Sequence, residues 1–254
     1  LGDVYKRQDW DKLKDACEIW NAQNRAKFEK WEYNRTDIPP HTGATAWLYR
    51  IFEHQAVCGV QKALDNDLKV NKLLAKQVAE RKFPKTVRYR AILWNTPCNN
   101  YANFNNWILN CWGIDSVCEM IDIHGTEQID TSNREDMLFG IAKMFQTSTM
   151  RAHTKGGYEV MVDDLWQKYA EYNCDMIILF DQISCKGMDG LQGIFDEQAR
   201  ERNINFIWVQ QDLMDPRTIS RRDMRRQVNQ YMTSVLRETP VDPTLLDFDD
   251  CDAF

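Results

Sequence analysis

A hydroxyl, a thiol and an amine follow the apolar segment at residues 175–180, where they could hold a cofactor. Ser184, Cys185 and Lys186 come soon after this segment, which is bounded by polar residues. A thiolate just after a strand is a soft ligand that suits iron, and Gly187 lets the backbone approach a bound group closely. Taken alone, these residue types allow an iron ligand at Cys185 but favour the alternative, a loop cysteine without a ligand role.

Two other segments end in residues that could do chemistry. Cys98 lies in the loop after residues 87–94, and it is either an additional ligand or, as we favour, a loop cysteine. His124 follows residues 117–123 and could act as an acid or base near neutral pH. We favour the alternative that His124 hydrogen-bonds a loop or caps the next helix.

A further loop follows residues 205–210 and carries Asp215, Pro216 and Arg217. Asp215 can accept hydrogen bonds from the loop backbone, Pro216 fixes φ, and Arg217 can reach a carboxylate with its planar guanidinium. We favour this structural interpretation over a role for Arg217 or Lys186 in neutralising a bound anion.

The elements that must position these residues alternate between strands and helices. Strands are predicted at residues 87–94, 117–123, 175–180 and 205–210. Helices are predicted at residues 101–112, 134–150, 157–172, 190–202 and 220–238. Connections of this length predict a parallel, Rossmann-like or flavodoxin-like α/β sheet with helices on both faces, and they disfavour a mixed sheet. Ligands bind beyond the carboxyl ends of such strands, so these residues should share one edge.

A different pattern precedes the sheet, because apolar residues recur there at helical spacing. Pro39–Gly43 interrupts this pattern. A helix is predicted before this interruption, and two more are predicted after it, at residues 44–54 and 55–81. The predicted divisions are a non-native scar at 1–8, a helical segment at 9–85, an α/β domain at 86–240 and an acidic tail at 241–254.

Composition restricts the class of protein. Hydrophobic residues make up 43% of the chain and charged residues 28%, as in ordinary globular proteins. The net charge of −6 argues against nucleic-acid binding, and no apolar run approaches the roughly 20 residues that span a bilayer. The eight cysteines form no Cys-x-x-Cys pair and no secretory signal precedes them, which predicts free thiols and a cytoplasmic location.

Four short motifs follow one another along the chain. They are Trp20-Asn21 through Asn24-Arg25 before the Pro39–Gly43 break, Tyr89–Leu93, Ser184–Lys186, and Asp212–Arg217 followed by Ser220 and an Arg-rich helix. In this order they resemble the 2-hydroxyacyl-CoA dehydratase / benzoyl-CoA reductase family. The resemblance covers about residues 9–238.

The resemblance implies the C-terminal half of an iron–sulfur subunit. A [4Fe–4S] cluster would lie between two α/β domains, and Cys185 matches the cluster cysteine of the second domain. The other ligands would belong to an N-terminal domain that this chain does not contain. Ser184, Lys186 and Arg217 would lie near the cluster or a CoA phosphate, and Cys98 departs from the family's usual aromatic residue.

The resemblance also implies an activity and its partners. Family members are anaerobic enzymes that pair two related subunits as a heterodimer and receive one electron from an ATP-dependent iron–sulfur activator. The electron converts an acyl-CoA thioester to a ketyl, which expels a hydroxyl in the dehydratases, whereas the reductases reduce an aromatic ring. A lyase is favoured over an oxidoreductase, and the fragment alone is expected to be inactive.

Two alternatives from other classes remain open. The chain could be an accessory domain of the same family that docks a partner and holds no cluster. It could also be a flavodoxin-like electron carrier, but a flavin is not expected, because no Ser/Thr-rich phosphate loop follows the first predicted strand.

Overall fold

A four-stranded parallel sheet forms the centre of the chain. The computed structural model describes residues 9–49, 58–82, 87–97 and 101–247. The strands are β1 (Tyr89–Trp94), β2 (Ile114–Glu119), β3 (Met176–Gln182) and β4 (Asn205–Gln211). Their order is β2-β1-β3-β4, and all neighbouring pairs run parallel. The predicted α/β fold class is therefore confirmed.

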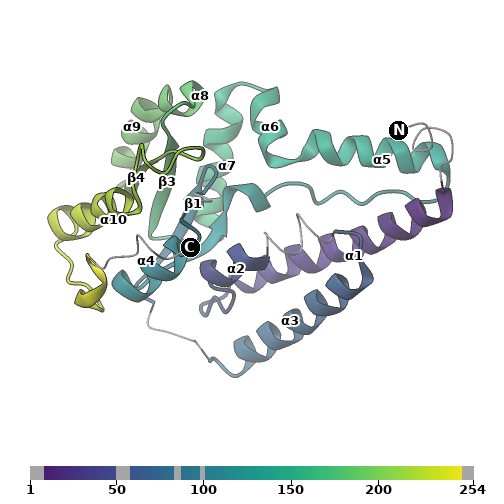
Figure 1. The fold of residues 1–254 in the computed structure, drawn as a ribbon, viewed down its shortest axis with the longest axis horizontal. Helices are drawn as coiled ribbons and strands as arrows, with labels where there is room; N and C mark the ends of the chain where they lie inside the picture. The colour runs from purple at the N-terminus through teal and green to yellow at the C-terminus, as the bar shows by residue number, and fades with distance from the viewer. Residues whose placement is uncertain (1–8, 50–57, 83–86, 98–100, 248–254) are drawn as a thin grey trace.

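Helices cover both faces of this sheet (Figure 1). One face carries α4 (Phe104–Trp112) and α10 (Arg221–Gln230), and the other carries α7 (Tyr158–Glu171), α8 (Lys186–Asp189) and α9 (Gln192–Arg202). Strand β3 is apolar on both faces: Ile177 and Leu179 pack with α7 and α9, whereas Ile178 and Phe180 pack with α4 and α10. This two-sided burial explains why its sequence is a continuous apolar run.

Three long helices extend away from the sheet and form what we call the helical arm (Figure 1). They are α1 (Trp10–Tyr33), α3 (Gln61–Ala79) and α5 (Arg134–Thr147). Helix α1 lies between the other two and contacts both. The shorter elements are α2 (Gly43–Tyr49), α6 (Thr149–Lys155), the 3-10 turns Met120–Asp122 and Pro243–Leu245, and the π-helical turn Tyr231–Val235.

Buried polar groups hold α1 in the arm. Lys30 forms an ion pair with Asp67 of α3, and both side chains are almost fully buried. The Asn21 side chain donates to the Ile129 carbonyl and accepts from the Ile129 amide, each at 2.8 Å. Asn24 donates to the Gly125 carbonyl at 2.6 Å. Helix α1 therefore fixes the irregular segment between the sheet and α5.

Arg90 of β1 joins the arm to the sheet. Its guanidinium donates to carbonyls that follow the last turn of α1, Asn34 at 2.7 Å and Thr36 at 3.1 Å. The same group donates to Tyr172 and Asn173 after α7, at 2.7 and 3.1 Å. A cation at two helix C-termini satisfies carbonyls that lack intrahelical partners and is favoured by both helix dipoles.

The second strand lies elsewhere than predicted. It was expected at residues 117–123 but runs from Ile114 to Glu119. Gly113, with φ +72°, ends α4 and turns the chain directly into the strand. The polar residues Asp115 and Ser116 are buried in this strand, so the apolar pattern did not reveal its start.

Two predicted helices also have different bounds. The helix expected at 55–81 begins at Gln61, because Gly59 adopts φ +75° just before it; residues 50–57 lie outside the described part. The helix expected at 134–150 stops at Thr147, because Ser148 has an extended ψ of 146°. A capping box formed by Ser220 and Asp223 begins α10.

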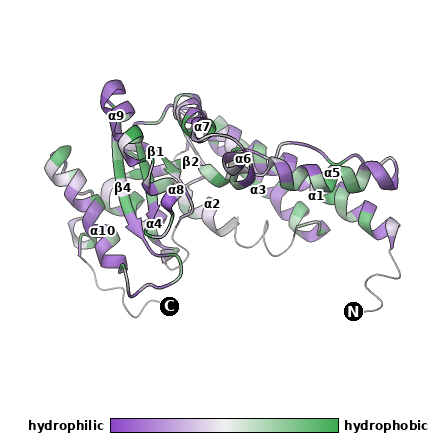
Figure 2. Cartoon of the chain, turned by 90° about the horizontal axis from the view of Figure 1, so that it is seen from above, coloured by the Kyte–Doolittle hydropathy of each residue, from purple (hydrophilic) through white to green (hydrophobic). Residues whose placement is uncertain are grey.

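The surface of the arm differs from that of the sheet domain. Figure 2 shows hydrophilic residues along α10 but alternating apolar and polar residues along α5. Phe139 and Phe145 of α5 are 73% and 65% exposed. Within the described residues, no helix is both long and apolar enough to cross a bilayer.

Candidate functional site

The carboxyl ends of three strands are tied together by side chains that reach from one strand to the next. Asn95, after β1, donates to the Phe180 carbonyl of β3 at 2.7 Å. Gln211, at the end of β4, donates to the Thr96 carbonyl at 2.5 Å. We call residues 95–97, 181–189 and 210–217 the strand-exit surface. It brings together the loops that the sequence predicted to share one edge.

Cys185 lies on this surface at the start of α8. Its amide donates to the Gln182 carbonyl at 2.8 Å, and its own carbonyl accepts from the amides of Met188 and Asp189, each at 3.0 Å. The side chain is half-buried against the apolar cluster on the α7–α9 face. A thiol held by a rigid turn, partly dry and partly accessible, has the placement that an iron ligand needs.

The two neighbours of Cys185 face solvent. Ser184 and Lys186 are both exposed. The Ser184 hydroxyl accepts a hydrogen bond from the Gln182 side chain at 3.1 Å. The side-chain oxygen of Gln182 accepts a hydrogen bond from the Leu213 amide at 2.8 Å. This hydrogen bond joins the loop after β3 to the loop after β4. A bound group at Cys185 would therefore meet both loops.

Arg217 is engaged within its own loop. Its guanidinium forms a bidentate pair with Asp215, at 2.8 and 2.7 Å, and its amide donates to the same carboxylate at 3.0 Å. These hydrogen bonds lower the pKa of Asp215. The Arg217 side chain is 88% exposed. This geometry is the structural role that the residue types suggested, and a bound anion would have to compete with Asp215.

A carboxylate pair lies beneath the same loop. Asp181, the sixth residue of β3, is buried, and its hydrogen bond and charge interaction with Asp189 link it to the end of α8. Burial, and secondly the proximity of Asp189, raise the pKa of Asp181 to about 6. Two carboxyl groups this close share a proton more readily than they ionise together.

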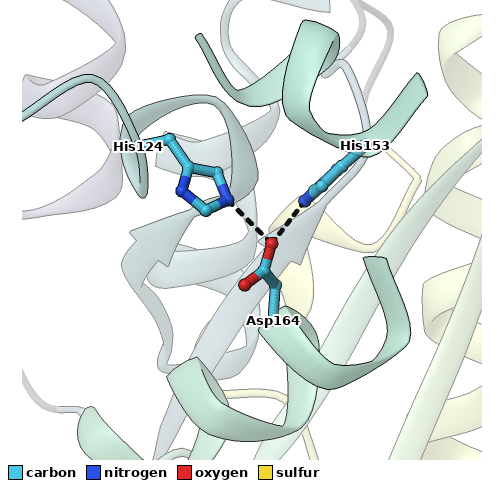
Figure 3. A group of neighbouring side chains, drawn as sticks. All are labelled: His124, His153 and Asp164. Atoms are coloured by element: carbon cyan, nitrogen blue, oxygen red, sulfur yellow. Dashed lines mark hydrogen bonds and ion pairs between the residues drawn. The ribbon is translucent and has the colours of Figure 1, made fainter. Parts of the chain in front are cut away.

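The predicted second strand, at residues 117–123, would have placed His124 directly at a strand end. Because the strand ends at Glu119, His124 does not lie there. It follows the 3-10 turn after β2 and meets His153 of α6 and Asp164 of α7 (Figure 3). Its Nε2 lies 2.7 Å from Asp164 Oδ2, and the Nε2 of His153 lies 2.8 Å from the same oxygen. The favoured prediction, a hydrogen bond to a loop or a cap on the next helix, is wrong in its partner, because His124 pairs with the Asp164 side chain within α7.

The other cysteines differ from Cys185 in their surroundings. Burial raises the pKa of Cys111 and of Cys174 to about 12, so neither gives a thiolate readily at neutral pH. Cys58 is exposed before α3. Cys98 lies outside the described residues. In the described part of the chain, Cys185 belongs to no group of three side chains that could hold a metal.

A family model provides the comparison with known proteins. The model for the D-component of 2-hydroxyglutaryl-CoA dehydratase matches residues 3–234. The chain belongs to this dehydratase family. The match covers the helical arm, the sheet and the strand-exit surface, and it confirms the resemblance drawn from the four motifs. A comparison with curated proteins found no match.

The family's iron–sulfur cofactor can be tested against these residues. A [4Fe–4S] cluster is normally held by four ligands, most of them thiolates. Cys185 fits as one of them, since its thiol is half-buried at the strand-exit surface. Among the described residues, no two further His, Cys, Asp or Glu side chains join Cys185 at the ligand spacing of a single metal ion.

Proposed function

We propose that this chain is part of a 2-hydroxyacyl-CoA dehydratase component in which the Cys185 thiolate holds a [4Fe–4S] cluster. The observation that carries the proposal is the placement of Cys185: a half-buried thiol on the strand-exit surface of a chain that belongs to the dehydratase family. A lyase is favoured over a ring reductase, because the matching family is described as a dehydratase. A bound cluster would supply one electron to the thioester of an acyl-CoA.

The residues of this chain would then hold and surround that group. Cys185 supplies one ligand from the hydrogen-bonded turn at the start of α8. Lys186, exposed beside it, offers a positive charge to the cluster or to a CoA phosphate. Arg217 contributes only after release from Asp215, so we give it the smaller role.

The remaining ligands and partners belong to the same proposal. The other thiolates would come from a further domain of the subunit, which makes residues 9–254 a fragment that is inactive alone. A second, related subunit and an ATP-dependent iron–sulfur activator would complete the cytoplasmic system. The alternative is an accessory domain of the same family that docks a partner and holds no cluster.

One experiment separates the two. The complete natural protein is produced anaerobically with iron and sulfide, and iron content and visible absorption are measured for the wild type, Cys185→Ser and the control Cys58→Ser. We expect brown wild-type and Cys58→Ser proteins with equal iron content and a loss of most cluster iron in Cys185→Ser. Colourless wild-type protein, or a Cys185→Ser variant with full iron content, would contradict cluster ligation and favour the accessory domain.

A further inference from the structure

The three side chains in Figure 3 come from three separate elements and converge on one point. His124 follows the 3-10 turn, His153 lies on α6 and Asp164 lies on α7. Their ligand atoms, two imidazole nitrogens and one carboxylate oxygen, all lie within 4.8 Å of one another. In the part of the chain that the structure describes, no other His, Cys, Asp and Glu side chains form such a group.

These distances are close to those of a coordinated metal ion. Ligand atoms about 2.0–2.1 Å from a tetrahedral Zn²⁺ lie roughly 3.3 Å from each other. The distances from the Asp164 oxygen to the two imidazole nitrogens are 2.7 and 2.8 Å. To make room for an ion, this oxygen would need to move about half an ångström away from both imidazoles. A small rotation of one carboxylate provides this shift.

The orientation of His153 is restricted by its surroundings. Its ring is packed against Trp94, with centroids 5.8 Å apart, and this packing limits its orientation.

Neighbouring hydrogen bonds fix the elements that carry the three residues. Thr149, at the start of α6, donates to the Ile121 carbonyl of the 3-10 turn at 3.0 Å. Asn24 of α1 holds the Gly125 carbonyl, directly after His124. These contacts limit the freedom of α6 and of the turn relative to each other, so little ordering remains when an ion binds.

An open cavity of about 410 Å³ borders the cluster on the His124 side. Thr126, Lys155 and Val160 also line it. The His124 side chain is 29% exposed and Asp164 17%, whereas His153 is buried. An ion held by three protein ligands would therefore keep its remaining positions open to water or to a small ligand in the cavity, as catalytic rather than structural zinc sites do.

We propose that His124, His153 and Asp164 form a binding site for one divalent transition-metal ion, with its open coordination positions directed to this cavity. Two imidazoles and one carboxylate favour Zn²⁺ or Fe²⁺ over Mg²⁺ and Ca²⁺, which prefer oxygen ligands. The site lies apart from Cys185 in the chain and does not depend on the proposed cluster.

The test compares Asp164→Asn with Asp163→Asn. An asparagine oxygen still accepts hydrogen bonds from both imidazoles but is a poor metal ligand, so this change removes ligation and retains the hydrogen-bonded arrangement. Asp163 is the exposed preceding residue of the same helix. Zn²⁺ binding to the metal-free protein is measured by calorimetry. Co²⁺ spectra distinguish nitrogen and oxygen ligands from thiolates, and Cys185→Ser is included as a check on the sulfur site.

We expect one Zn²⁺ per chain in the wild type, Asp163→Asn and Cys185→Ser, and an affinity at least about 100-fold weaker in Asp164→Asn, more than the loss seen for second-shell changes. The thermal midpoints of the metal-free wild type and Asp164→Asn should be similar. Failure of the wild type to bind Zn²⁺, equal affinity in Asp164→Asn, or a thiolate spectrum lost in Cys185→Ser would each overturn the proposal. Cluster ligation by Cys185 is tested separately, by the iron content of the anaerobically produced protein.

Discussion

The sheet and the helical arm are stabilised by different interactions. Residues such as Ile177 and Ile178, which point to opposite faces, make the sheet apolar on both faces, and they are completely buried. In the arm, α1 is held by a buried ion pair and by amide side chains that bond backbone groups. Apolar packing tolerates imperfect orientation, whereas each polar contact leaves an unsatisfied buried group when one partner is removed. Single polar substitutions should therefore affect the arm more than the sheet.

The largest effect is expected from Lys30→Met. This change leaves Asp67 buried without its cation and should destabilise the protein by about 3–5 kcal/mol. Urea unfolding measures the loss. The double variant Lys30→Met/Asp67→Leu should recover most of the stability, because an apolar pair of similar volume is often neutral or better. If the double variant is no more stable than Lys30→Met, the arm depends on this site for reasons other than the unpaired charge.

Asp115 is a polar exception within the sheet and predicts a dependence on pH. Burial raises its pKa to about 7, although the Gly43 amide and Arg90 oppose this effect. The folded protein therefore binds a proton that the unfolded chain releases, and stability falls as the pH rises from about 4 to about 7. Asp115→Asn imitates the neutral acid and should be more stable than the wild type by a few kcal/mol at pH 8, since one pKa unit is about 1.4 kcal/mol.

Thermal midpoints of the wild type and Asp115→Asn at pH 4.5 and pH 8 test this sign. The advantage of the variant should be large at pH 8 and small at pH 4.5. An advantage that is equal at the two pH values would mean that Asp115 ionises at its usual pKa.

Asn21→Ala should have an intermediate effect on the arm. The change leaves the buried amide and carbonyl of Ile129 without partners, at a cost of about 1–3 kcal/mol for each unsatisfied group. Asn106→Ala, on the exposed surface of α4, is the control and should change stability by less than about 0.5 kcal/mol. Denaturant unfolding of both variants gives the comparison, and similar losses in the two would refute the importance of the amide contact.

The smallest effect is expected from Ser220→Ala on the sheet side. It removes the capping box of α10 and should cost about 1 kcal/mol. The apolar contacts of Met224 and Val228 with the sheet keep the helix in place. A loss above that of Asn21→Ala, measured in the same unfolding experiments, would show that polar contacts matter equally in both regions.

The sequence predicts the sheet better than it predicts the helical arm. Strands β1, β3 and β4 and the shared edge of their loops could be predicted, because apolar runs end in polar loops at each of them. Strand β2 was misplaced, since buried Asp115 and Ser116 interrupt its pattern. The arm's contacts could not be predicted. Asn21 belongs to the first motif, but its partner Ile129 lies 108 residues away and belongs to none of the four.

The candidate sites show the same limit. Cys185 was identified because a thiol directly after an apolar strand is a local signal. The sequence singled out His124 without its partners. His153 and Asp164 lie on two successive helices, α6 and α7, and come together only because the chain turns between them. No periodicity within one element places these three side chains together.

The contacts of α1 with Gly125 and Ile129 also bear on how the protein folds. The two contacts join pairs of residues whose separations in the sequence are 101 and 108 positions. Helix α1 therefore completes its hydrogen bonds only after β1, α4 and β2 have been synthesised. Contacts of such high sequence separation slow folding, because a long loop must close before they form. Helix α1 is synthesised before these partners and is therefore among the last of the described elements to reach its final environment, and we expect arm formation to be a late step in refolding.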